Sequence, residues 1–245
     1  MRKLVILLLT ALTLNAWAQA DYTREQRWAD EITPAILVGD PLQLALPSGR
    51  KFLAIHAPNA KAQAGVVVVH GLGVHPDWGL INPLRSNLSE QGYATLSVQM
   101  PVLASEARGD QYPPLFPEAA ERIAAAVAFM RKQGHKKVAI VAHSLGARMT
   151  NVFLNTAGTP AIDAFVAIGI SGEYSKPETF KAPVLDLMGE KDLPAVLDNA
   201  AKRAGTIRTL RGSGQISVAG ADHFFNGKER ELVQQVKLFL DRATR

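Results

Sequence analysis

The chain has 245 residues, a formal net charge of +5 at pH 7 and no cysteine. The absence of cysteine excludes disulfides, thiolate metal sites, a cysteine nucleophile and a lipid-modified cysteine. The basic residues are scattered along the chain and form no stripe, which argues against a nucleic-acid partner. We also expect neither a metal nor a cofactor.

Residues 1–18 are predicted to be a secretory signal peptide. Arg2 and Lys3 give a positive start, and residues 4–14 form an apolar run. This run is about half of the roughly 20 residues that a spanning helix needs, so we expect no stable membrane insertion after cleavage. Small residues place the cleavage after Ala18 or Ala20. One domain over residues 21–245 then remains, and we expect it in the periplasm.

The mature sequence begins with residues 21–39, which have mixed charge and no clear hydrophobic period. From there on, predicted strands alternate with predicted helices. Two short strands flank the turn at residues 47–49, and further strands are predicted at 64–70, 94–100, 137–142, 162–170, 182–189 and 215–220. Helices are predicted at residues 80–92, 117–134, 146–157, 194–205 and 228–242. This alternation predicts an α/β fold with a mainly parallel, twisted sheet and helices on both faces.

The stretch VAIVAHSLGARMT, residues 138–150, joins a predicted strand to a predicted helix. Ser144 at the junction is a candidate nucleophile on a sharp turn, which needs small neighbours because the strand and helix backbones pass closely. Gly146 meets this need, whereas Ala142 replaces the first glycine of the pattern G-x-S-x-G with one extra methyl group. The alternative is that Ser144 only caps the helix.

A serine nucleophile needs a base in hydrogen-bond reach and an acid that orients the base. In an open parallel sheet these groups gather at the carboxyl ends of the strands. His223 follows the last predicted strand and is the candidate base, and Asp192 follows the strand before it and is the candidate acid. Glu190 and Asp222 remain rival acids at this point.

The oxyanion of such a reaction needs hydrogen-bond donors as well. The glycines of HGLG, residues 70–73, permit a tight turn just after the first long strand. We expect the backbone N–H groups of Leu72 and Leu145 to form the oxyanion hole.

The segments HGLG, AHSLGA, GEKD and ADHFF stand in this order, each after its own strand. In this order they resemble the oxyanion loop, nucleophile elbow, acid and histidine of an α/β-hydrolase, over about residues 40–245. The resemblance implies a single-domain α/β-hydrolase fold. Large caps in this fold usually follow the strand after the elbow. Here the next strand comes quickly, so the cap is expected to be short or absent and the site open.

A closer likeness lies in HGLGVHPDW and the sequence that follows it. It resembles a poorly characterised family of secreted bacterial α/β-hydrolase-like proteins with a His-Pro-Asp-Trp stretch after the oxyanion loop. His56 and His135 are predicted to lie at the surface. The loop at residues 101–116 is expected to form a partial wall of the site. The candidate pocket residues are His70, His75, Trp78, Tyr112, Phe116 and His143.

Together these features predict a secreted serine hydrolase that cleaves carboxylic esters through an acyl-enzyme. Its substrate would be a small molecule or an acylated compound, and the sequence leaves its identity and the oligomeric state open. A peptidase, thioesterase or perhydrolase of the same fold is an alternative, and so is a catalytically idle binding protein. A dinucleotide-binding oxidoreductase is disfavoured, because no G-x-G-x-x-G motif follows the first strand.

Overall fold

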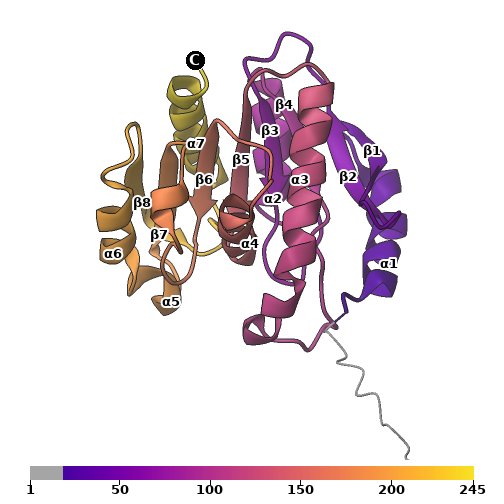
Figure 1. Ribbon diagram of the computed structural model, residues 1–245, viewed down its shortest axis with the longest axis horizontal. Helices are drawn as coiled ribbons and strands as arrows, with labels where there is room; N and C mark the ends of the chain where they lie inside the picture. The colour runs from indigo at the N-terminus through magenta and orange to yellow at the C-terminus, as the bar shows by residue number, and fades with distance from the viewer. Residues whose placement is uncertain (1–18) are drawn as a thin grey trace, which may run out of the picture.

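The computed structural model describes residues 19–245, and the predicted signal peptide at residues 1–18 lies outside the described residues. Within the described part, eight strands form one sheet in the order β1-β2-β4-β3-β5-β6-β7-β8 (Figure 1). The β1–β2 and β2–β4 pairs are antiparallel, and the other neighbouring pairs are parallel. The prediction of a single α/β domain with a mainly parallel sheet is confirmed.

The bounds of the elements agree with most of the predicted ones. The strands are β1 (Asp40–Ala45), β2 (Lys51–Ala57), β3 (Gly65–Val69), β4 (Ala94–Val98), β5 (Val138–His143), β6 (Ala164–Ile168), β7 (Val184–Lys191) and β8 (Gly214–Asp222). The α-helices are α1 (Tyr22–Ile32), α2 (Ile81–Glu90), α3 (Phe116–Lys132), α4 (Leu145–Asn155), α5 (Pro194–Leu197), α6 (Ala200–Ile207) and α7 (Glu229–Ala243). Short 3-10 helices lie at η1 (Thr33–Ala35), η2 (Gly109–Gln111), η3 (Pro113–Leu115) and η4 (Pro177–Thr179).

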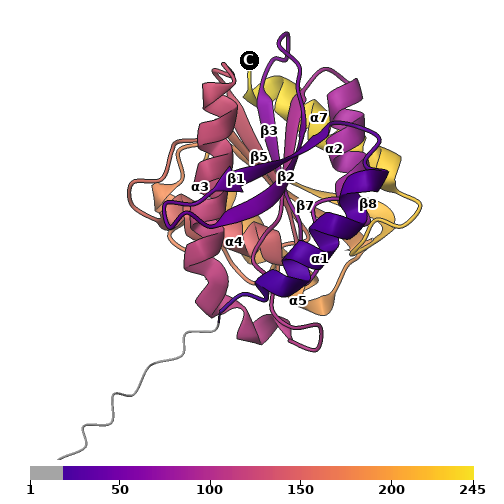
Figure 2. The same cartoon turned by 90° about the vertical axis from the view of Figure 1, so that its right-hand side faces the viewer.

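Alternate residues of the central strands face two separate cores, one on each side of the sheet. Val67 and Val69 of β3 pack in the core that α3 and α4 cover. Val66 and Val68 pack in the core that α2 and α7 cover. Figure 2 shows these two pairs of helices on opposite sides of the sheet. A strand buried on both faces has no polar side, which explains its continuous β-branched sequence.

Helix α1 is an element that the sequence analysis does not predict. Its first turn is capped by Asp21, whose carboxylate accepts a hydrogen bond from the Arg24 N–H (2.9 Å). Its buried residues are Glu25 and Ala29, and Glu25 pairs with Arg122 of α3 (2.8 Å). Because polar contacts hold this helix, no apolar stripe marks it in the sequence.

Two further predictions are wrong. The helix predicted at residues 194–205 is two helices, α5 and α6, because Asn199 leaves the helical backbone with φ −106° and ψ 1°. His56 and His135 are buried rather than at the surface. The His56 ring on β2 meets the edge of Phe129 on α3, with 5.1 Å between ring centroids.

The connection between β6 and β7 affects how openly the carboxyl ends of the strands face solvent. Within the described chain, residues 169–183 hold only the 3-10 helix η4 and no inserted domain. The carboxyl end of β6 therefore carries no inserted cap domain. Separately, no helix in residues 19–245 has the length and apolar character needed to cross a membrane.

We predict that Arg122 holds α1 against α3. Its fully buried guanidinium pairs with Glu25 and Glu118 and donates to the Gln99 carbonyl (3.0 Å). Arg122→Met leaves the buried Glu25 carboxylate without that cation, so the free energy of unfolding in urea should fall by about 3 to 5 kcal/mol. Adding Glu25→Leu removes the unpaired charge and should restore at least half of this loss. A double variant no more stable than Arg122→Met would contradict this account.

Candidate active site

Ser144 lies on a strained turn between β5 and α4. Its backbone has φ 54° and ψ −122°, a conformation that costs a non-glycine residue about 1 to 3 kcal/mol. The turn is fixed by a hydrogen bond from the Ser144 N–H to the Ile168 carbonyl (2.7 Å). The Ser144 side chain makes no capping bond to α4. The structure therefore does not support the alternative in which Ser144 only caps the helix.

Two glycines, one in the loop after β3 and one at the start of α4, permit that loop and the turn at Ser144 to approach closely. A Cβ atom on Gly146 would lie 2.2 Å from the His70 carbonyl oxygen, and one on Gly71 would lie 3.1 Å from the Ser144 Cβ. Ala142 needs no such allowance, because its methyl group is fully buried in the core beneath the sheet. The extra methyl group at Ala142 is thus compatible with the turn.

The loops after β5, β7 and β8 bring Ser144, Asp192 and His223 together. His223 Nε2 lies 3.0 Å from Ser144 Oγ, and His223 Nδ1 lies 2.6 Å from Asp192 Oδ1. The Asp192 carboxylate also accepts from the N–H groups of Gly189 (3.1 Å) and Leu193 (2.8 Å). Burial opposes ionisation of Asp192, but these hydrogen bonds, led by that from His223, outweigh it and lower its pKa. An ionised Asp192 accepts a hydrogen bond from the His223 Nδ1–H, which leaves Nε2 unprotonated and facing the serine hydroxyl.

The rival acids face other partners. Glu190 is exposed, and its carboxylate accepts from the Gly220 N–H (2.8 Å). Asp222 Oδ1 accepts from the N–H groups of Phe224 (2.9 Å) and Asn226 (3.2 Å), so it closes the turn beyond β8. Of the three acids, only Asp192 contacts the His223 ring in the described structure.

Gly169 is a site residue that the sequence analysis misses. It follows β6 with φ 57°, and a Cβ atom there would lie 3.0 Å from two atoms of the His223 ring. The same atom would lie 3.4 Å from Asp192 Oδ2. Its sequence signal is a glycine at the carboxyl end of the strand next to the elbow strand. This position therefore leaves the space that the imidazole and carboxylate occupy.

Two of the predicted pocket residues are buried supports instead. His143 Nε2 lies 3.0 Å from the His223 carbonyl oxygen, and burial next to His223 lowers the pKa of His143 to about 4. The neutral ring can donate to that carbonyl at pH 7. His70 Nε2 accepts from the Met100 N–H (2.9 Å), and burial lowers the pKa of His70 to about 3. Both rings are nearly inaccessible to a substrate.

The predicted wall residues are also placed differently from the prediction. Tyr112 and Phe116 are buried in the core under α3, and the Tyr112 hydroxyl accepts from the Leu103 N–H (3.1 Å). His75 Nδ1 accepts from the Asp77 N–H (3.3 Å), and its ring meets the edge of Trp28 on α1, with 5.7 Å between ring centroids. Trp78 is the predicted pocket residue that remains exposed.

The loop expected to supply the oxyanion hole packs directly against the elbow. Within residues 19–245, the backbone N–H groups of Leu72 and Leu145 have no protein acceptor. Helix α1 secures the loop from outside, because Arg24 donates to the carbonyls of Gly73 (3.0 Å) and Leu103 (2.7 Å). The sequence analysis misses this contact because it does not predict α1.

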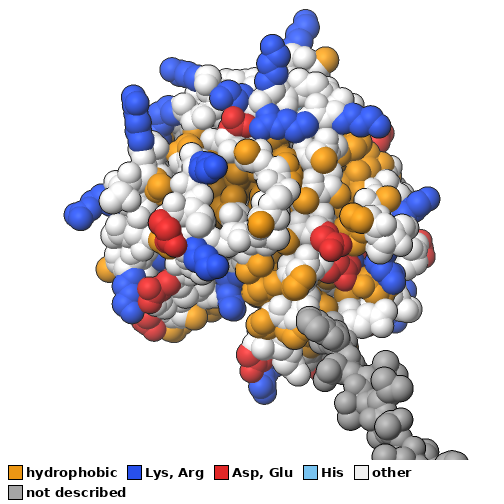
Figure 3. Space-filling model, viewed as in Figure 1, with side chains coloured by type: hydrophobic (Ala, Val, Ile, Leu, Met, Phe, Trp, Pro, Cys, Tyr) orange, Lys and Arg blue, Asp and Glu red, His pale blue; other side chains and the backbone are white. Residues whose placement is uncertain are grey.

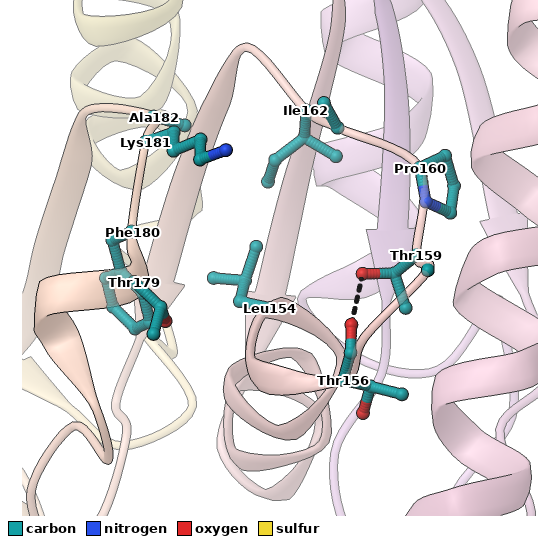
Figure 4. A pocket seen from close by; sticks show the side chains of 11 residues that line it. Leu154, Thr156, Thr159, Pro160, Ile162, Thr179, Phe180, Lys181 and Ala182 are labelled. Atoms are coloured by element: carbon teal, nitrogen blue, oxygen red, sulfur yellow. Dashed lines mark hydrogen bonds between the residues drawn. The ribbon is translucent and has the colours of Figure 1, made fainter.

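A cavity of about 200 Å³ lies beside the amino-terminal ends of β6 and β7, whereas Ser144, Asp192 and His223 lie at the carboxyl ends of their strands. Figure 4 shows Leu154, Ile162 and Phe180 among its lining, with a hydrogen bond from the Thr159 hydroxyl to the Thr156 carbonyl. It holds none of the three grouped residues. On the face drawn in Figure 3, Lys and Arg side chains are spread out rather than gathered in one stripe.

The comparisons with known proteins agree with this geometry. The family model described as "Alpha/beta hydrolase family" matches residues 66–241, well over half of the chain, so the chain belongs to the α/β hydrolase family. A second model, "Protein of unknown function (DUF3530)", matches residues 4–119. None of the curated proteins matches the chain.

Solved structures of hydrolases share the fold. Dienelactone hydrolase from Anabaena variabilis has a TM-score of 0.68 and 20% identity, with 84% of this chain and 99% of that chain covered. An α/β serine hydrolase without a lid from Xanthomonas campestris has a TM-score of 0.66 and 15% identity, with 84% and 95% covered. An esterase from Pyrococcus furiosus has a TM-score of 0.67 and 13% identity, with 84% and 93% covered.

The close approach at the elbow gives a prediction for one methyl group. Gly146→Ala places Cβ against the His70 carbonyl, so the free energy of unfolding should fall by about 2 to 3 kcal/mol. Gly205 of α6 has open space at the same position and is the matched control. Gly205→Ala should leave stability unchanged or raise it by up to about 1 kcal/mol. Urea denaturation of both variants measures the difference, and equal stabilities would count against the tight elbow.

Proposed function

We propose that this chain is a secreted serine hydrolase that cleaves carboxylic esters through an acyl-enzyme on Ser144. The observation that carries the proposal is the continuous hydrogen-bonded chain from Ser144 Oγ through the His223 ring to Asp192, with distances of 3.0 and 2.6 Å. Membership of the α/β hydrolase family supports it, and so do the similar structures of an esterase and a serine hydrolase.

The first half of the reaction forms the acyl-enzyme. Ser144 Oγ attacks the ester carbonyl carbon while His223 Nε2 takes the hydroxyl proton. The carbonyl oxygen becomes an oxyanion, which accepts hydrogen bonds from the backbone N–H groups of Leu72 and Leu145. The C–O bond to the alcohol then breaks, and His223 gives its proton to the leaving oxygen. Asp192 stays ionised and stabilises the imidazolium.

The second half repeats these steps with water. His223 takes a proton from a water molecule as its oxygen attacks the acyl carbon. The bond to Ser144 Oγ breaks, His223 returns the proton to the serine, and the carboxylic acid leaves. No step needs a metal or a cofactor, because the chain's own groups move every proton.

The secreted location is part of the same proposal. The structure bears on the cleavage point, because Ala20 is buried and its carbonyl accepts from the Tyr22 N–H (3.0 Å). Cleavage after Ala18 keeps this contact, whereas cleavage after Ala20 removes it. We therefore favour Ala18. The intact mass of protein recovered from a periplasmic extract should match a chain that begins at Gln19, and a mass matching the uncleaved chain would contradict secretion by this signal.

The test of the reaction compares variants of Ser144 and Asp192 on a p-nitrophenyl ester. Ser144→Ala should remove nearly all turnover without unfolding the protein, and Asp192→Asn should lower kcat on the order of 10³- to 10⁴-fold. Glu190→Gln is the matched control and should stay near wild type, because its side chain contacts Gly220 rather than His223. Turnover by Ser144→Ala at the wild-type rate would rule out the proposed nucleophile. A folded wild-type protein with no turnover of any ester would favour an idle binding protein.

A further inference from the structure

Large apolar side chains gather on the loops around the candidate active site. Leu72 of the oxyanion loop is 41% exposed, Leu193 beside the candidate acid is 48% exposed, and Phe224 beside the candidate base is 43% exposed. Trp78, on the loop that follows the oxyanion loop, is 38% exposed. Single exposed apolar residues need no explanation, but a group of them around one site is typical of ligand contact.

Two of these side chains touch each other and reach the base. The ring centroids of Trp78 and Phe224 are 5.7 Å apart with an angle of 76° between the planes. The Phe224 ring in turn lies 5.1 Å from the His223 imidazole, also edge to face. The two rings therefore form an angled aromatic surface that ends at the group expected to move the proton.

Phe224 is held outward by the turn that carries it. Its N–H donates to Asp222 Oδ1 (2.9 Å), and the next residue, Phe225, is fully buried with φ 55°. A left-handed backbone is unusual for a bulky residue, and such strain clusters at functional sites. With Phe225 directed into the core, Phe224 keeps its ring partly in solvent.

Trp78 also stands on a fixed loop. The backbone N–H of Trp78 donates to the His75 carbonyl (3.1 Å), and the preceding residue, Asp77, forms an ion pair with Arg85. Arg85 is 2% exposed. The aromatic surface is therefore built before any ligand arrives, and a ligand would not have to order it.

The position of this surface indicates which part of an ester it meets. This step rests on the proposed function, in which His223 Nε2 protonates the leaving alcohol oxygen. The alcohol substituent then starts beside the imidazole, against which Phe224 packs. We propose that Trp78 and Phe224 bind the alcohol portion of the ester and that the preferred substrates are esters of apolar or aromatic alcohols. Both rings are partly exposed, so this surface is open to solvent.

The experiment uses ethyl acetate, benzyl acetate and ethyl hexanoate with the full mature protein. For Trp78→Ala and Phe224→Ala, the ratio of kcat/KM on benzyl acetate to kcat/KM on ethyl acetate should fall about tenfold. The ratio of kcat/KM on ethyl hexanoate to kcat/KM on ethyl acetate should not change. Phe224→Tyr keeps the ring and should keep the preference for benzyl acetate. Leu238→Ala on α7 removes a similarly exposed apolar side chain outside the site and should leave every ratio unchanged.

Each other outcome overturns the inference in a different way. A lower ratio of kcat/KM on ethyl hexanoate to that on ethyl acetate, with an unchanged benzyl preference, would place the acyl chain on the rings instead. An equal fall on all three esters would indicate a structural role. Ser144→Ala is measured alongside on each ester. If wild type and Ser144→Ala are equally slow, the proposed function fails and the inference fails with it. Ser144-dependent turnover with unchanged ester ratios in the Trp78 and Phe224 variants defeats the inference alone.

Discussion

The positive φ of Ser144, 54°, is the backbone constraint on which the geometry of the site depends. A strained residue persists only where its surroundings hold it. Here the Ser144 N–H is bonded to the Ile168 carbonyl of the neighbouring strand, and α4 begins at the next residue. Gly146 lets that helix pass the His70 carbonyl without a clash. The result is a serine hydroxyl 3.0 Å from His223 Nε2, at the carboxyl ends of the parallel strands.

Much of the fold follows from patterns that the sequence shows directly. Runs such as residues 66–69 are β-branched throughout because both faces of the strand are buried, and they alternate with amphipathic helices. Helix α1 escapes this reasoning, because the Asp21 cap and the buried pair between Glu25 and Arg122 hold it. The partner Arg122 is 97 residues away in the chain, so no local pattern reports the contact.

The site could be predicted only as far as chain order goes. Ser144, His223 and Asp192 each follow a strand, and parallel strands bring their ends together. Glu190 lies near the end of β7, and Asp192 follows that strand directly. The register between β7 and β8 is irregular between Gly189 and Lys191, and it is the Asp192 carboxylate that meets the imidazole. The spacing of residues along the sequence does not show which way their side chains point. For the same reason the pocket candidates His70 and His143 prove to be buried supports of the loops.

The central claim is that the hydrogen-bonded chain from Asp192 to Ser144 activates this serine. The most direct measurement is labelling of the purified mature protein with a fluorophosphonate, followed by mass mapping of the modified peptide. This reagent reacts with activated serine hydroxyls, so it tests activation without knowledge of the natural substrate. The account predicts one adduct on Ser144 that is lost in Ser144→Ala and in His223→Ala. A folded protein that takes up no label, or that is labelled at another serine, would contradict it.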